Sequence, residues 1–187
     1  MKRYMLYLDN SSYKPEDARY LKNKARSLIP RDEIIIRDAR VSSHHIEYDI
    51  SIANDEDISD FANRLSDIGR LADYYEVVET HRDKPQAIAE AVVAFNEEKY
   101  WIAHEILESV WKTCQGNEKN LINGIILASA AFVHHQKGEE DICISILQRA
   151  LKKLEKAHGI YYQICLDGLK NSIRNILATG KVQIFRI

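Results

Sequence analysis

The chain reads IEYDISI at residues 46–52, and this strict alternation of apolar and polar residues decides the fold of its N-terminal part. Successive side chains of a β-strand point to opposite faces of a sheet. The apolar positions therefore share one face, and Glu47, Asp49 and Ser51 share the other. We predict a half-buried strand whose three polar side chains lie on the open face of a sheet.

The segments around this strand complete a small α+β fold. Further strands are predicted at residues 2–9, 33–41 and 72–80, and helices at residues 14–29 and 55–71. Pro15 suits the first turn of the earlier helix, and Pro30 is expected to end it. The order β-α-β-β-α-β is that of ferredoxin-like domains, in which two helices cover one face of a four-stranded antiparallel sheet. Residues 1–80 are therefore predicted to form a ferredoxin-like domain.

The period becomes helical after the charged residues 81–84, where we place a domain boundary. Residues 81–187 are predicted to form an all-α bundle of about five helices built from two helical hairpins. The expected helices span residues 85–96, 99–114, 118–137, 139–157 and 165–178. Gly116 with Asn117 is expected to stop the second of them. The third is apolar on most sides, which is typical of a central helix.

Composition restricts the function classes. Apolar residues make up 45% and charged residues 29% of the chain, which argues against disorder. The net charge is -2, and residues 81–187 hold 14 basic against 12 acidic residues, so nucleic acid is not an expected partner. No apolar run suits a bilayer span or a signal peptide, so we expect no membrane association and a cytoplasmic location. Cys114, Cys143 and Cys165 are too widely spaced to indicate a disulfide framework or a metal knuckle.

Self-association is expected from two features. Residues 182–187 are apolar for a chain end and are expected to dock on the protein or on a partner. A small four-stranded sheet also leaves two unpaired edges. We therefore predict a homodimer.

Residues 95–111 contain a cluster of polar and aromatic residues that could form a functional site. On a helix, Tyr100, His104, Leu107, Glu108 and Trp111 follow one another at spacings of four, three, one and three, so they share a side. A histidine with a carboxylate one turn away, flanked by aromatic rings, could be an acid–base pair with shifted pKa values. The same pair could supply two ligands of a metal site.

Three more residues are candidates for the same site. Glu105 follows His104 directly but points about 100° away around the helix, so Glu108 is the expected partner of His104. Asn123 and His134 lie on the next predicted helix, at spacings that turn His134 inward. His104, Glu108 and His134 would meet only if their heights along the bundle matched, and the sequence leaves this open.

Three roles for these residues stay open: a structural polar network, a small-molecule or catalytic pocket, and a metal site. The helical signature His-Glu-x-x-His is absent, because a glutamate stands where its second histidine would follow His104. The spacing of the four plausible ligands, His104, Glu105, Glu108 and His134, matches no closed site. We therefore expect no stoichiometric metal and no cofactor in the purified protein.

Two motifs carry a family resemblance. The first runs from Phe95 to Trp111 and includes Tyr100, Trp101, Ala103, His104, Glu105, Leu107 and Glu108. The second runs from Leu121 to Ala128 and is followed by His134 and Gly138. Together they resemble the helical family known as domain of unknown function 309, over roughly residues 85–155. Leu127 stands near the place where that family usually has a glutamine. The resemblance implies a helical bundle and no particular reaction.

These observations support three functions. The preferred one is a non-catalytic binding or scaffold protein with a His-Glu-Trp network in its helical bundle and a small molecule as an optional ligand. The alternative is a hydrolytic or acid–base enzyme using His104 with Glu105 or Glu108, with or without a metal. RNA binding comes third, because acidic residues on the open sheet face would repel phosphate. An open concavity at His104 would favour the enzyme, and a closed network would favour the scaffold.

Overall fold

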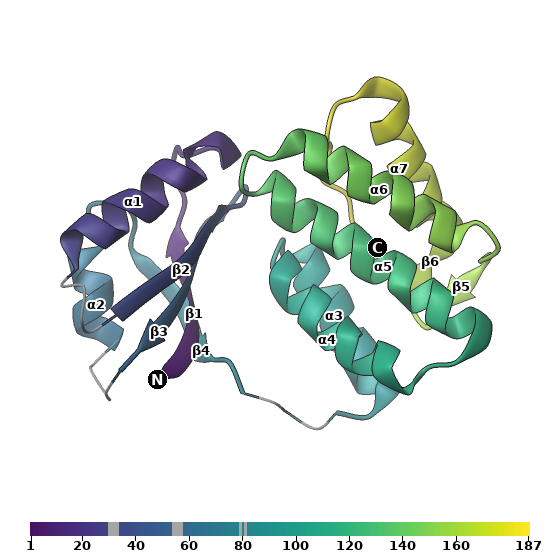
Figure 1. Cartoon of the computed structure of the whole chain (residues 1–187), viewed down its shortest axis with the longest axis horizontal. Coiled ribbons are helices and arrows are strands. Elements are labelled where there is room, and N and C mark those ends of the chain that lie inside the picture. The colour runs from purple at the N-terminus through teal and green to yellow at the C-terminus, as the bar shows by residue number, and fades with distance from the viewer. Residues whose placement is uncertain (30–33, 54–57, 79, 81) are drawn as a thin grey trace. The chain divides into compact units, whose positions relative to one another are not determined.

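The computed structural model describes residues 1–29, 34–53, 58–78, 80 and 82–187 (Figure 1). It divides into two compact units. The sheet unit comprises Met1–Thr80 with Gln136–Gly138, and the helical unit comprises His81–His135 with Glu139–Ile187. The predicted helix end at Pro30, the strand start at 33, the helix start at 55 and the boundary residue His81 lie outside the described residues.

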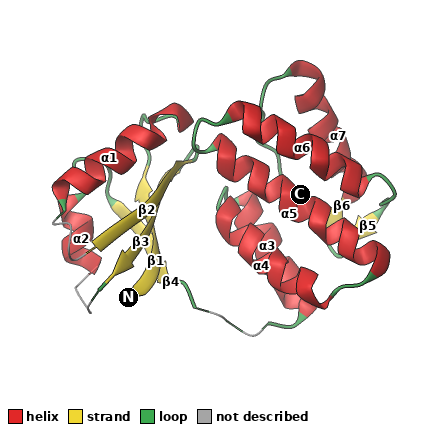
Figure 2. Cartoon of the chain, viewed as in Figure 1, coloured by secondary structure: helices red, strands yellow, loops and turns green. Residues whose placement is uncertain are grey.

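The sheet unit contains the predicted order of strands and helices. Its elements are β1 (Lys2–Asp9), a 3-10 turn (Pro15–Asp17), α1 (Ala18–Leu28), β2 (Ile34–Val41), β3 (His45–Ile52), α2 (Ile58–Arg64) and β4 (Leu71–Glu76). The strands pair in the order β2-β3-β1-β4, and all neighbours are antiparallel (Figure 2). The prediction of an antiparallel four-stranded sheet is confirmed. α2 is shorter than the helix predicted for residues 55–71.

One face of the sheet forms an apolar core with α1 and α2. Leu21 of α1 and Phe61 of α2 belong to the same buried cluster as Ile46 and Ile50 of β3. Pro15 lies in the first turn before α1, as its fixed backbone angle allows. Tyr48 is fully buried, and its hydroxyl donates a hydrogen bond to the Leu21 carbonyl at 3.1 Å. This bond satisfies the one polar atom that β3 sends into the apolar layer.

The other face of β3 differs from the prediction. Glu47, Asp49 and Ser51 are not open to solvent: they are 1%, 4% and 1% exposed. Each has an arginine partner on a neighbouring strand, because a long side chain reaches residues directly or diagonally opposite on a paired strand.

These partners come from both sides of β3. Arg40 of β2 lies opposite Glu47 and forms an ion pair with it. Arg3 of β1 donates to both carboxylate oxygens of Asp49, at 2.9 and 2.6 Å, and Arg37 Nε donates to Ser51 Oγ at 2.7 Å. The alternation in β3 therefore separates two buried layers, one apolar and one ionic.

The helical unit contains the five predicted helices: α3 (Lys84–Asn96), α4 (Tyr100–Thr113), α5 (Gly116–His135), α6 (Glu140–Leu154) and α7 (Leu166–Thr179). Between the last two helices the chain forms a short ribbon of β5 (Ile160–Tyr161) and β6 (Ile164–Cys165), for which the sequence analysis predicted no element. Gly116 adopts the left-handed conformation, with φ of 56°, but it opens α5 rather than only ending α4. This glycine lets the chain reverse within a very short link.

α5 is the central helix, as its apolar sequence predicts. It packs against both α4 and α6 (Figure 1). Gly124 allows the close approach of α6: a Cβ at this position would lie 2.6 Å from Leu154 Cγ. Ile122, Ile125 and Phe132 are fully buried around it. None of the helices in the described part of the chain is long and apolar enough to cross a bilayer.

The apolar chain end docks on the helical unit itself. Val182, Phe185 and Ile187 pack against its core, and the Phe185 ring lies 5.2 Å from that of Phe132. The Asn96 side chain accepts a hydrogen bond from the Ile187 amide at 2.9 Å and donates one to the Ile187 carbonyl at 3.3 Å. The end segment therefore behaves as part of this unit.

Candidate functional site

The first turns of α4 position the residues that the sequence singled out. α4 buries one stripe of side chains, which includes Ala103, Leu107 and Val110. His104 and Glu108 lie one turn apart beside this stripe and are half-buried, so they stand at the border between core and solvent. Such a border position desolvates a polar group in part and still leaves it reachable by a ligand.

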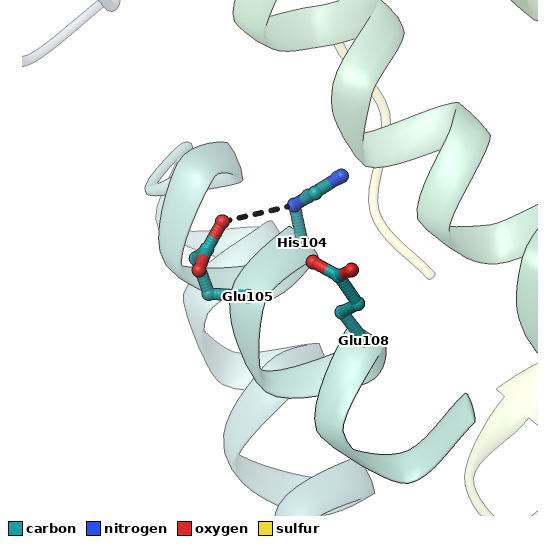
Figure 3. A group of neighbouring side chains, drawn as sticks. All are labelled: His104, Glu105 and Glu108. Atoms are coloured by element: carbon teal, nitrogen blue, oxygen red, sulfur yellow. Dashed lines mark hydrogen bonds and ion pairs between the residues drawn. The ribbon is translucent and has the colours of Figure 1, made fainter. Parts of the chain in front are cut away.

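Three polar side chains gather here, as Figure 3 shows. His104 Nδ1 lies 3.3 Å from Glu105 Oε1. One ligand atom from each of His104, Glu105 and Glu108 lies within 4.8 Å of the other two. The side chains of His104 and Glu105 are 28% and 45% exposed. We call these three residues the α4 cluster.

The partner of His104 differs from the prediction. Its contact is Glu105 rather than Glu108. Helix geometry fixes only where a side chain leaves the backbone, and a glutamate has three rotatable bonds with which to turn back along an open helix surface. Glu108 forms no hydrogen bond or ion pair with any residue that the structure describes. Its carboxylate is therefore available to a ligand next to the imidazole.

The electrostatics of the α4 cluster favour a cation. Two carboxylates and one imidazole nitrogen converge on a small volume at the edge of the apolar core. Neutral imidazole and carboxylate oxygens are the ligands that zinc and similar divalent ions accept in proteins. A positive charge between Glu105 and Glu108 would also relieve the repulsion of two like charges.

Tyr100 belongs to the core rather than to this cluster. Its ring is fully buried, 4.8 Å from the Phe132 ring and 4.9 Å from the Phe95 ring. Its hydroxyl has no hydrogen-bond partner within the described ranges. Burial, and then the charge of Glu98, raises the pKa of Tyr100 far above its ordinary value. Tyr100 therefore fills space and offers no proton near neutral pH.

Trp111 borders the core at the far end of α4. Lys119 of α5 places its ammonium group 4.2 Å from the centre of the Trp111 ring, a cation–π contact between the two helices. The indole Nε1 is buried and unpaired as far as the described residues go. Trp111 thus joins α4 to α5 and makes no hydrogen bond to His104 or Glu108.

The last two predicted residues lie elsewhere. His134 Nδ1 lies 2.5 Å from Glu139 Oε2, at the end of α5, and His134 is not in the α4 cluster. Asn123 lines a separate groove together with residues of α6. The seven candidate residues therefore do not form one network: three of them make up the α4 cluster, and Tyr100, Trp111, Asn123 and His134 have other neighbours.

One set of polar residues escaped the sequence analysis. Arg149, Lys152, Lys153 and Lys156 line the same groove as Asn123. Their spacings of three, one and three residues place four cations on one face at the end of a helix. Counting charge per helix face, rather than per half of the chain, would have found this pattern.

Comparison with known proteins bears on the helical half alone. No curated protein matches the chain. The model of one family, described as Domain of unknown function (DUF309), matches residues 88–146, which contain the α4 cluster and α5. The resemblance carried by the motifs around His104 and Asn123 is thus confirmed: residues 88–146, in the C-terminal half of this chain, are similar to that family.

Proposed function

We propose that the chain is a non-catalytic binding protein whose helical unit holds an exchangeable divalent metal ion at the α4 cluster. A single observation carries this proposal: ligand atoms of His104, Glu105 and Glu108 lie within 4.8 Å of one another. Zinc binds imidazole nitrogen and carboxylate oxygen at roughly 2.0–2.2 Å, so ligand atoms around one ion lie about 3–4 Å apart. Small rotations of the two glutamates would bring the cluster to that spacing.

The site would be an open one. Three protein ligands leave at least one position of a tetrahedral ion to water or to a bound molecule. Because His104 and Glu105 are partly exposed, water competes with their side chains as a ligand of the ion. We therefore expect exchangeable binding, and protein purified without added metal should still hold less than one ion per chain. The sequence also predicts no stoichiometric metal, because the ligand spacing matches no closed site. In the proposed site the reason is different: the site exchanges its ion with solvent.

Binding of Co²⁺, followed by its visible absorption and displaced by Zn²⁺, tests the proposal. The wild-type chain should bind one ion, and His104→Ala and Glu108→Gln should each lose binding. His134→Ala is the matched control, because His134 also pairs with a glutamate but lies outside the cluster. Its binding should equal that of the wild type. Equal loss in all variants, or no binding by the wild type, would overturn the proposal.

The enzyme alternative has less support. It requires a concavity that reaches His104, and the large groove of the helical unit is lined by other residues. Glu47 and Asp49 are buried with arginine partners rather than exposed, so their charges no longer argue against RNA binding by repelling phosphate. No observation of the helical unit favours catalysis over binding.

Self-association stays a prediction, and of the two features that suggested it only the unpaired sheet edges still support it. The apolar end segment is already packed on its own helical unit, so it no longer argues for a partner. The sheet still has β2 and β4 at its two edges. Edge strands present unpaired backbone groups to which a second chain can add.

A further inference from the structure

A second feature of the helical unit lies apart from the α4 cluster: a groove with a volume of about 870 Å³. It lies between the first half of α5 and the end of α6, and β5 forms a further wall. This volume lies within the range of small-molecule sites in proteins. All of its lining residues belong to the helical unit.

The groove is positively charged in a chain whose net charge is -2. Four cations line it, Arg149, Lys152, Lys153 and Lys156, against the two carboxylates of Glu118 and Glu155. The charge of Glu118 is already compensated: Lys84 Nζ donates to its two oxygens at 3.1 and 3.0 Å, and the Tyr161 hydroxyl donates at 2.8 Å. These bonds lower the pKa of Glu118 and hold it as an anion turned to its own partners.

The cations themselves are available. Arg149, Lys152 and Lys156 form no ion pair or hydrogen bond with any residue of the described segments. Lys153 makes one contact of 3.4 Å, to the Asn120 side chain. Lysine ammonium groups and the forked guanidinium of arginine are the usual partners of phosphate oxygens in proteins.

Apart from the imidazole of His158 and the ring of Tyr161, the rest of the lining is apolar or amide. Leu121, Leu127 and Ile160 give the groove an apolar wall, and Ile160 is 76% exposed. Asn117 and Asn123 add side-chain amides that can donate to oxygen atoms. A ligand that satisfies both parts needs an anionic head for the cations and an apolar or aromatic body for the leucine and isoleucine side chains.

We infer that this groove binds an organic phosphate, a small molecule with a phosphate group attached to an apolar body. The phosphate would lie against the cations at the end of α6, and the body would cover Leu121 and Ile160. This site is separate from the α4 cluster and does not depend on the metal proposed there.

Calorimetric titration of the full chain with 1-naphthyl phosphate tests the inference. EDTA is present throughout, so that no metal ion can link ligand and protein. The wild type should bind 1-naphthyl phosphate more tightly than inorganic phosphate or 1-naphthol, each of which satisfies only one part of the groove. Lys152→Glu with Lys156→Glu should weaken binding by about tenfold or more, which corresponds to about 1.4 kcal/mol.

The matched control reverses two exposed lysines outside the groove, Lys112→Glu with Lys181→Glu, and should bind like the wild type. Ile160→Ser should weaken binding of 1-naphthyl phosphate and leave that of inorganic phosphate unchanged. Equal weakening by both charge-reversed pairs would show unspecific attraction and overturn the inference. Tighter binding of a short single-stranded oligonucleotide than of 1-naphthyl phosphate would overturn it in favour of a nucleic-acid surface.

Discussion

One layer of the sheet unit and the centre of the helical unit are filled in different ways. The second layer of the sheet unit contains an ion pair, Arg40 with Glu47, whose side chains are 3% and 1% exposed. The centre of the helical unit is filled by apolar side chains such as Ile125 and Phe132, and the hydroxyl of buried Ser129 donates only to the Ile125 carbonyl of its own helix. One layer of the sheet unit therefore depends on pairing of charges, and the apolar centre of the helical unit depends on fit of volumes.

The largest effect is expected from breaking a charge pair in the sheet unit. Glu47→Ala should lower the free energy of unfolding by about 3 kcal/mol, the low end for a broken buried pair, because buried Arg40 loses this partner and keeps its longer ion pair with Asp38. The double change Glu47→Leu with Arg40→Met should cost far less, since it removes both charges together. Urea unfolding of the three proteins measures this. A single variant as stable as the wild type would contradict the comparison.

A smaller effect is expected from adding volume to the helical unit. Gly124→Ala would place a Cβ 2.6 Å from Leu154 Cγ, so α5 and α6 must separate or Leu154 must turn. The expected loss is about 1–3 kcal/mol. Gly168→Ala is a milder control, because its Cβ would meet the exposed Cys165 side chain at 3.3 Å. Equal thermal stability of the two variants would show that the α5–α6 contact tolerates volume.

Acid should weaken the sheet unit through Asp38. Burial opposes ionisation of Asp38, but Arg40, then Lys137 and Lys22, attract its charge more strongly and lower its pKa below the ordinary 3.8. A lowered folded pKa means that the stabilisation is present above the ordinary value and is lost as pH falls through the folded one. Asp38→Asn should flatten the acid limb of the stability curve from about pH 5 downward. A curve unchanged by this substitution would exclude Asp38 as a source of the pH dependence.

The smallest effect is expected from a polar atom that has no partner. Tyr100→Phe removes a buried hydroxyl for which the described residues offer no hydrogen bond. The free energy of unfolding should stay within about 0.5 kcal/mol of the wild-type value or rise, because no bond is lost and an unsatisfied group disappears. Tyr48→Phe is the control in the sheet unit and should cost about 0.5–1.5 kcal/mol, since that hydroxyl donates to the Leu21 carbonyl. A larger loss at Tyr100 than at Tyr48 would reverse the comparison.

The sequence by itself determined which elements form and in what order. The alternation at residues 46–52 predicts β3, and the 3.6-residue period after Lys84 predicts five helices, because both patterns depend on residues only a few positions apart. It also indicated that His104 and Glu108 leave one side of a helix, and that the apolar residues 182–187 would dock on the protein or on a partner. The short ribbon at Ile160–Tyr161 gave no comparable signal, since two residues are too few to show a period.

Only the tertiary structure decided how polar residues are used. Glu47 and Asp49 look like solvent-exposed residues in the sequence, but Arg40 and Arg3 reach them from neighbouring strands, seven and 46 residues away in the chain. Asn123 joins Arg149 in a groove rather than His104 in a network, because the packing of α5 on α6 sets which faces meet. Periodicity records which side of an element is apolar. The partner of each polar group depends on distant residues and on side-chain rotation, and no local pattern contains that information.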